Sequence, residues 1–254
     1  MKTIPEEWMH GAKFLDGPDP TVFRFGAASL KPKKKKLPKK VNIKAKFSPV
    51  YEQNCGCCTT CASLACDDYY YHGSAKPWVP SWKFTYYLQR KKQGDKDLSK
   101  DGGSIILYGL QCIKKYGACS SKVWSNDEPL DKKPSKEAYE NGLKGHEVTK
   151  YYAISSFTQL REALAKKYPV AISMNWVKSS YDPETFILDS WTKEEAKQHH
   201  SGHAVVIVGY DDTKKLVEIR NSWGADWGNN GYIYMTYDMF KISAHYTDAY
   251  AVVK

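Results

Sequence analysis

The sequence predicts an α+β fold in which a mainly helical first half packs against a mainly antiparallel β half. After residue 58, apolar and small side chains recur at three- and four-residue steps, which is typical of helices. From residue 169 onward, short β-rich runs follow one another between turn signals, which is typical of antiparallel strands. We therefore expect two lobes with a site in the cleft between them.

The helical half is expected over about 48–145. Cysteine and alanine spacing predicts a first helix from Cys58 to Tyr69. Two further helices are expected over 82–92 and 104–116, and Gly117 ends the second of them because glycine favours the position after a helix.

The β half is expected over about 146–254. It opens with one helix, because Ser156 and Gln159 form a capping box and Pro169 stops the helical pattern. The strands expected after this helix are PVAISM, HAVVIVGY, KLVEIRNS, GYIYMTY and AYAVVK. The run TVFRF, near the N-terminus, is a candidate for one additional strand.

Length and composition indicate a folded protein without a membrane span. The 254 residues are 42% hydrophobic and 14% aromatic, and no run of 18 apolar residues occurs. The first 30 residues lack the apolar core of a secretory signal. We therefore expect an intracellular, cytoplasmic protein with reduced thiols, with packaging in a virion or a nuclear location as alternatives.

The net charge of +10 is concentrated in one segment. Residues 31–46, KPKKKKLPKKVNIKAK, hold nine lysines and no acidic residue. We interpret residues 1–38 as an N-terminal arm that runs into this lysine-rich linker, and residues 39–254 as one folded domain. The linker is either a solvated spacer or a weak contact for nucleic acid or another acidic partner. No membrane partner is expected, and the protein is expected to be a monomer.

Five of the seven cysteines fall within QNCGCCTTCASLAC, residues 53–66. A structural zinc site would need a second ligand pair, but the distant Cys112 and Cys119 are seven positions apart. A thioredoxin-like redox site would need a βαβ context, which the pattern lacks. A catalytic nucleophile would instead need a distant histidine and a distant asparagine or aspartate.

Both partners occur in the second half. SGHAVVIVGYDD places His203 directly before an apolar strand, and IRNSWGADWGNNGYIYM places Asn221 at the end of the next strand. Adjacent antiparallel strands can hold these residues side by side, so the amide oxygen can accept the second N–H of the imidazole. Cys58 lies 145 positions before His203, within the spacing of about 130–150 known for such pairs.

These segments resemble the papain-like (cathepsin-type) cysteine peptidases over residues 39–254. PVYEQNCGCCTTCASLA is similar to the family's nucleophile segment, DGGSIILYGLQCIKKYGACSSKVW to its substrate-binding segment, and GHAVVIVGY and RNSWG to its histidine and asparagine segments. The closest similarity is to compact bacterial and viral-type members without a long pro-region. The resemblance implies a helical lobe, a β-barrel-like lobe and a site between them.

The resemblance also implies roles for individual residues. Cys58 is expected to be the nucleophile, activated at a helix N-terminus. His203 is expected to pair with its thiolate and to act as general acid, and Asn221 to orient His203. Trp223 is expected to shield that pair from water, and Gln53 to form the oxyanion hole with the backbone N–H of Cys58.

For the substrate, Gly102 and Gly103 are expected to let an extended peptide backbone approach closely. Ala204 is expected to line the main side-chain pocket. Asp101 beside the glycine pair suggests the further hypothesis of a preference for a basic substrate residue. His199 and His200 are rival bases in principle, but His203 alone fits the GHAVVIVGY pattern.

Three features depart from the family pattern. Gln53 precedes Cys58 by five positions where family members usually have six, so either Gln53 or Asn54 supplies the oxyanion donor. Cys55 stands where many secreted relatives have a disulfide cysteine, but the sequence has no matching cysteine near DGG. About 40 residues precede the domain, and they are expected to pack over the cleft or along the back of the β lobe.

The sequence therefore predicts a thiol peptidase that hydrolyses peptide bonds through a thioester, with no cofactor and no metal. Three alternatives stay open. The first is a catalytically inactive relative that binds peptides, and the second is a nucleic-acid-associated virion protein. The third is a metal or redox protein built on the cysteine cluster. A disulfide between Cys58 and one of its neighbours is the form that a redox role would take.

Overall fold

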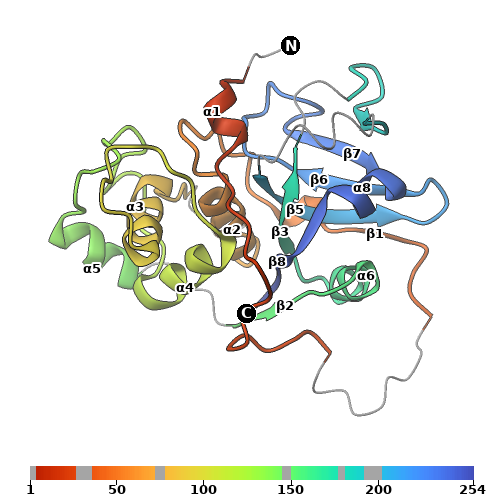
Figure 1. Cartoon of the computed structure of the whole chain (residues 1–254), viewed down its shortest axis with the longest axis horizontal. Helices are drawn as coiled ribbons and strands as arrows, with labels where there is room; N and C mark the ends of the chain where they lie inside the picture. Colours follow the sequence, from red (N-terminus) through yellow and green to blue (C-terminus); the bar gives the residue numbers. More distant parts are fainter. Residues whose placement is uncertain (1–3, 27–35, 72–77, 145–149, 177–180, 192–201) are drawn as a thin grey trace.

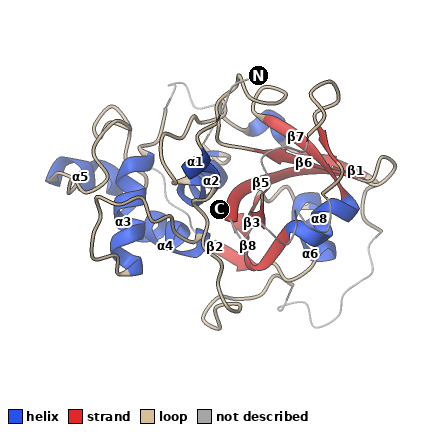
Figure 2. Ribbon diagram, turned by 45° about the horizontal axis from the view of Figure 1, so that its top comes forward, coloured by secondary structure: helices blue, strands red, loops and turns tan. Residues whose placement is uncertain are grey.

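A computed structural model of the chain describes residues 4–26, 36–71, 78–144, 150–176, 181–191 and 202–254. Its helices and strands separate into two lobes (Figures 1 and 2). The α+β two-lobe arrangement predicted from the sequence is confirmed. Within the described residues, no helix is both long and apolar enough to cross a membrane.

Four helices form the helical lobe. They are α2 (Cys58–Asp68), α3 (Trp82–Gln93), α4 (Ile106–Tyr116) and α5 (Lys136–Lys144). The first three are the helices expected from the sequence. Every residue of α2 is buried, because this helix lies between the rest of its lobe and the sheet. The pattern CTTCASLAC is accordingly small and weakly polar on all sides of the helix.

Local signals fix where these helices begin and end. The Ser81 hydroxyl accepts the backbone N–H of Phe84 at the start of α3, and Gly94 ends it with a φ of 89°. The expected cap is also present at α6 (Phe157–Ala165), where the Ser156 hydroxyl accepts the N–H of Gln159 at 3.3 Å. Short polar caps thus mark element boundaries in both lobes.

The β lobe is built on one sheet in which the described strands number eight. They are β1 (Lys40–Asn42), β2 (Lys150–Ala153), β3 (Val170–Asn175), β4 (Ile187–Leu188), β5 (Gly202–Asp211), β6 (Leu216–Arg220), β7 (Tyr232–Thr236) and β8 (Ala244–Val253). The order is β2-β8-β3-β5-β6-β7-β4, with β1 pairing to β5. All pairings are antiparallel except the one between β4 and β7. The helix α8 (Tyr237–Ser243) connects β7 to β8.

Part of the lysine-rich linker belongs to the β lobe. Residues 40–42 form β1, and Lys44–Lys46 forms a short 3-10 helix. The apolar residues Val41 and Ile43 are buried, whereas Lys40 and Lys46 on either side of them are exposed and Lys44 is half-buried. The linker residues 31–35 lie outside the described residues. The run TVFRF contributes a single bridge, from Arg24 to Ala153, and no strand.

A buried carboxylate joins the two lobes. Asp248 on β8 accepts the backbone N–H groups of Ile106 and Leu107, at the first turn of α4, at 3.0 and 3.3 Å. It also accepts the hydroxyl of Ser173 on β3 at 2.7 Å. Burial raises the pKa of Asp248 to about 6. The carboxylate therefore caps α4 from the opposite lobe and fixes how the two lobes meet.

Candidate active site

The start of β5 and the end of β6 bring two predicted site residues together. The Nε2 of His203 donates to Oδ1 of Asn221 at 2.7 Å, and both side chains are buried. Trp223 packs against the imidazole with ring centroids 4.6 Å apart, as expected of a side chain that shields this bond. The other ring nitrogen, Nδ1, has no hydrogen-bond partner among the described residues. His203 is thus held by one nitrogen and keeps the other for a proton transfer.

Cys58 is the first residue of α2, directly opposite this pair. Its sulfur accepts the backbone N–H of Ala204, the residue that follows His203. Burial raises the pKa of the Cys58 thiol to about 12, and burial lowers the pKa of His203 to about 4. Burial therefore disfavours the charged form of both groups, the thiolate of Cys58 and the imidazolium of His203.

Gln53 lies beside Cys58 despite the short spacing between them. Its Oε1 accepts the hydroxyl of Ser222 at 2.5 Å, which turns the amide nitrogen toward the site. That nitrogen donates to the carbonyl of Cys55 at 2.8 Å and to the carbonyl of Trp8 at 3.0 Å. The second bond marks where an oxygen atom can bind in this site. Ser222, within the NSWG motif, is a positioning residue that sequence reasoning did not identify.

Asn54, the alternative oxyanion donor, faces away from the site. Its Nδ2 donates to the carbonyl of Asn126 at 2.7 Å, and its Oδ1 accepts the indole N–H of Trp82 at 3.1 Å. Both ends of this amide are therefore engaged within the helical lobe. The geometry favours Gln53 over Asn54 as the donor.

The N-terminal arm crosses the site between the two lobes (Figure 1, red). After α1 (Glu6–Met9), Ala12 donates its N–H to the carbonyl of Gly202 on β5 at 2.9 Å. Ser104 of the helical lobe donates to the carbonyl of Gly11 at 2.9 Å and accepts the N–H of Lys13 at 2.7 Å. The arm therefore pairs with one lobe on each side, next to the glycine pair at which the sequence predicts substrate binding.

Glycines make this close approach possible. A Cβ at Gly11 would lie 2.1 Å from the carbonyl oxygen of Gly56, and one at Gly202 would lie 2.2 Å from that of Ala12. A Cβ at Gly103, whose φ is 65°, would lie 2.5 Å from the carbonyl oxygen of Gly11. The backbone that approaches Gly103 in this structure is that of the arm. Gly102 is exposed.

Phe14 fixes the arm beyond the crossing point. Its ring stacks on the imidazole of His245 with centroids 3.8 Å apart and an interplanar angle of 18°. Oδ1 of Asn175 accepts from Nε2 of His245 at 2.9 Å, and burial lowers the pKa of His245. A neutral, oriented ring therefore provides the stacking surface.

The remaining predicted residues have local roles. Ala204 is 1% exposed, and its N–H contacts Cys58 as described above. The Asp101 carboxylate accepts the backbone N–H of Gly56 and the hydroxyl of Tyr86. His199 and His200 lie outside the described residues. All seven cysteines are free and buried, and no cluster of metal-ligating side chains occurs in the described part of the chain.

Comparison with known proteins identifies the family. The sequence profile of the papain family cysteine proteases matches residues 37–252. An uncharacterized peptidase C1-like protein of Acanthamoeba polyphaga mimivirus is 32% identical over 178 residues, which cover 63% of this chain and 54% of that protein. A cysteine proteinase of Theileria parva is 27% identical over 195 residues, covering 72% of this chain and 39% of that one. The chain thus spans about half or less of the length of these relatives.

The solved structures agree with the sequence comparison. Xylellain, a cysteine protease from Xylella fastidiosa, superposes with a TM-score of 0.77 at 26% identity, and the match covers 100% of both chains. Bromelain from Ananas comosus, in complex with the E64 inhibitor, has the same fold with a TM-score of 0.62 at 18% identity. This chain belongs to the papain family of cysteine proteases.

Proposed function

We propose that the protein hydrolyses peptide bonds with Cys58 as nucleophile, and that residues 8–14 of the arm hold the enzyme latent. The catalytic proposal rests on the hydrogen bond of 2.7 Å between Nε2 of His203 and Oδ1 of Asn221. The Cys58 sulfur accepts the backbone N–H of Ala204, the next residue along β5. This geometry leaves the Nδ1 of His203 for the thiol.

The proposed reaction balances without a cofactor. His203 takes the proton of Cys58, and the thiolate attacks the carbonyl carbon of the substrate. The oxyanion accepts hydrogen bonds from the Cys58 N–H, which has no intrahelical partner at the start of α2, and from the Gln53 amide. The imidazolium of His203 then protonates the departing amine, and a thioester remains. Water, deprotonated by His203, hydrolyses the thioester and restores the thiol.

Latency follows from what the arm does to this machinery. The Trp8 carbonyl accepts a hydrogen bond from the Gln53 side-chain amide, which would otherwise donate to the oxyanion. Burial raises the pKa of the Cys58 thiol and lowers the pKa of the His203 imidazole. It therefore opposes formation of the thiolate–imidazolium pair. Displacing the arm admits water, which stabilises the charged pair.

The test uses the full chain. In Gly11→Val, the new Cβ would meet the Gly56 carbonyl at 2.1 Å, so the arm must leave its place. Gly17→Val is the matched control, because a Cβ there meets nothing within 4 Å. We expect an epoxysuccinyl thiol-protease inhibitor to label Cys58 at least tenfold faster in Gly11→Val than in the wild type or in Gly17→Val, and Gly11→Val to cleave an unfolded protein.

Peptide mapping and one further variant decide between the readings. Label on Cys57 or Cys61, or cleavage that persists in Gly11→Val/Cys58→Ala, would contradict the catalytic assignment. Labelling of Cys58 without cleavage of any unfolded protein would favour the inactive, peptide-binding alternative. Equal labelling of wild type and Gly11→Val would contradict latency while leaving the nucleophile assignment intact.

We also propose that the substrate partner is a polypeptide and that the protein is a monomer. A weak contact with nucleic acid would involve the lysines before β1, because three of the later ones already have protein partners: Lys40 contacts Asp211, Lys44 contacts Glu218, and Lys46 lies over the Tyr69 ring. Filter binding of single-stranded DNA at increasing salt, with lysines 33–36 replaced by serine, measures this contribution. Unchanged binding in the replaced protein would refute it.

We propose an intracellular location, supported by seven buried free cysteines. Fractionation of the source cells and of any virions tests this. Recovery only in the extracellular medium would contradict an intracellular location, and enrichment in virions or nuclei would select one of the two alternatives.

A further inference from the structure

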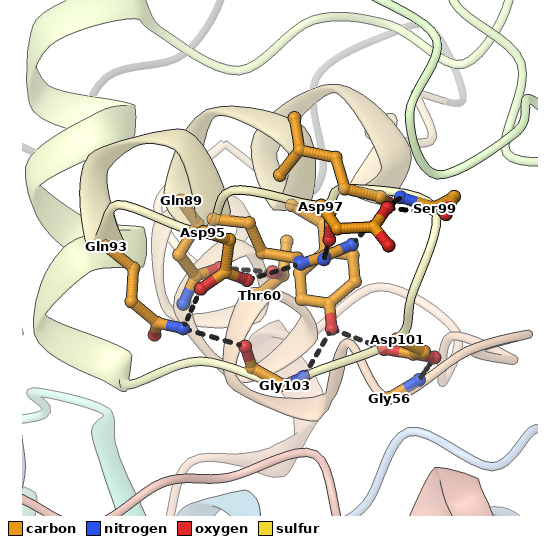
Figure 3. A network of polar contacts seen from close by, with 12 residues as sticks. Gly56, Thr60, Gln89, Gln93, Asp95, Asp97, Ser99, Asp101 and Gly103 are labelled. Atoms are coloured by element: carbon orange, nitrogen blue, oxygen red, sulfur yellow. Dashed lines mark hydrogen bonds and ion pairs between the residues drawn. The ribbon is translucent and has the colours of Figure 1, made fainter.

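One carboxylate connects the loop that carries the nucleophile to the loop that receives the substrate backbone (Figure 3). Oδ2 of Asp101 accepts the backbone N–H of Gly56 at 2.6 Å, and Oδ1 accepts the hydroxyl of Tyr86 at 2.5 Å. The Tyr86 oxygen in turn accepts the backbone N–H of Gly103 at 3.0 Å. Gly56 lies between Gln53 and Cys58, so both halves of the site depend on this chain of bonds.

The surroundings make the connection specific. A Cβ at Gly56 would lie 2.9 Å from Oδ1 of Asp101, so the carboxylate occupies the space that a side chain would need. Tyr86 is 1% exposed, and burial together with the neighbouring Asp101 charge raises its pKa, which keeps the hydroxyl proton available for donation. Both carboxylate oxygens therefore have defined donors.

The rest of this loop is anchored separately. Arg90, on α3, donates to Oδ2 of Asp95 at 2.9 Å and to the carbonyl of Leu98 at 2.8 Å. Gln93, also on α3, donates to Oδ1 of Asp95 at 2.8 Å. These bonds hold residues 95–98 against α3 but do not reach the nucleophile loop. Among the described side chains of this loop, Asp101 is the one whose hydrogen bond reaches Gly56.

No covalent bond performs this task. Cys55 next to Gly56 is a free, buried thiol, and the segment from residue 95 to residue 105 contains no cysteine. The link between the two loops is therefore a set of hydrogen bonds to a charged acceptor, which is stronger than a neutral bond and insensitive to reducing agents.

We propose that Asp101 is a positioning residue that holds the nucleophile loop, residues 53–58, against the substrate-binding loop, residues 102–104. This inference rests on the proposed peptidase function. It is an alternative to the idea that Asp101 recognises a basic substrate residue, since its two oxygens accept from Gly56 and Tyr86.

The test compares Asp101→Ala, Asp101→Asn and Asp97→Ala, each in the full-length Gly11→Val protein. Asp97 is the matched control, because it is an exposed carboxylate of the same loop whose side chain contacts only Ser99 and Lys100. We expect Asp101→Ala to lower kcat/KM about tenfold, since a charged hydrogen-bond acceptor is lost and the loops shift relative to each other. Asp97→Ala should remain at the parent value.

Asp101→Asn separates positioning from charge recognition. An asparagine can still accept from Gly56 and can donate to the Tyr86 oxygen, so it should retain activity within about threefold of the parent. The losses in Asp101→Ala should be equal for substrates with basic and with neutral side chains. Loss confined to basic substrates, with Asp101→Asn as poor as Asp101→Ala, would overturn the proposal in favour of charge recognition. Equal activity of Asp101→Ala and Asp97→Ala would overturn it outright.

A second measurement does not depend on catalysis. Amide hydrogen exchange at Gly56 and Gly103 should accelerate at least tenfold in Asp101→Ala and in Tyr86→Phe, but not in Asp97→Ala. Tyr86→Phe preserves the volume of the ring if Asp101→Ala fails to fold. If the Gly11→Val parent lacks peptidase activity, the proposed function fails. Unchanged exchange at Gly56 and Gly103 would refute the positioning role of Asp101.

Discussion

The hydroxyl of Ser222 donates to Oε1 of Gln53 at 2.5 Å, and this bond decides which way the Gln53 amide faces. The two residues lie in the first and the last quarter of the sequence. Their backbones are also joined, because the N–H of Gln53 donates to the carbonyl of Ser222 at 2.8 Å. The pair fixes the orientation of Gln53, the residue that we propose as oxyanion donor, although its loop is one residue shorter than the family pattern.

Ser222→Ala should therefore weaken catalysis without removing a catalytic group. Without the hydroxyl, the Gln53 amide is free to rotate and its N–H spends less time facing the oxyanion. Since deleting an oxyanion donor outright costs roughly 10²–10³ in kcat, we expect a loss of about tenfold with little change in KM. Steady-state kinetics in the Gly11→Val protein measure this.

Ser190→Ala is the control for that experiment, because Ser190 is an exposed serine whose hydroxyl donates to the neighbouring Asp189. A tenfold rise in KM at constant kcat would show that Ser222 acts on substrate binding rather than on the oxyanion donor.

Phe14→Ala should loosen the arm. The stacked pair with His245 contributes about 1 kcal/mol beyond the area it buries, and loss of both terms favours the open state by about tenfold. The rate at which an epoxysuccinyl inhibitor labels Cys58 in the full chain reports the open fraction. Phe23→Ala is matched to it, because Phe23 lies in the same arm but is 79% exposed. Identical labelling rates in the two variants would mean that the stack does not hold the arm.

Arm closure should be strongest in a window around neutral pH. Burial lowers the pKa of His203 to about 4 from an ordinary value of about 6.5, so protonation favours the open state as the pH falls from 6.5 toward 4. Burial raises the pKa of Cys58 to about 12, so deprotonation favours the open state as the pH rises above about 8.5. Amide resonances of Ala12 and Lys13 measure the closed fraction directly.

A closed fraction that is constant from pH 4 to pH 10 would contradict this coupling. Cys58→Ala should abolish the alkaline limb alone, and this selective loss is the internal control for the assignment.

Asp248→Ala should lower the free energy of unfolding by about 3 kcal/mol, since two N–H groups of α4 and the Ser173 hydroxyl lose a buried acceptor. Urea denaturation measures this. Asp238→Ala is the control, because its side chain is 93% exposed on α8. A loss no larger than that of the control would mean that the lobes do not depend on this cap.

Motif and periodicity were sufficient for the parts of the molecule in which local pattern and tertiary context agree. The helix of Cys58 follows from small and apolar residues at three- and four-residue steps, and the strands of His203 and Asn221 follow from β-rich runs between turn residues. The same reasoning could have predicted β1, since Val41 and Ile43 alternate with polar residues. The lysine run suggested a solvated linker there instead. α5 and α8 are short, and no helix was expected in either segment.

The sequence by itself determined the two-lobe class and the family, and it selected Cys58, His203 and Asn221 as the predicted site, because these depend on periodic burial and on a motif that few folds share. Only the tertiary structure decided that the arm lies across the site, that Ser222 binds the Gln53 amide, and that Asp101 binds the backbone of Gly56. These facts depend on hydrogen bonds between backbone and side-chain groups distant in the chain. Such bonds leave no periodic pattern, so only the folded chain contains them.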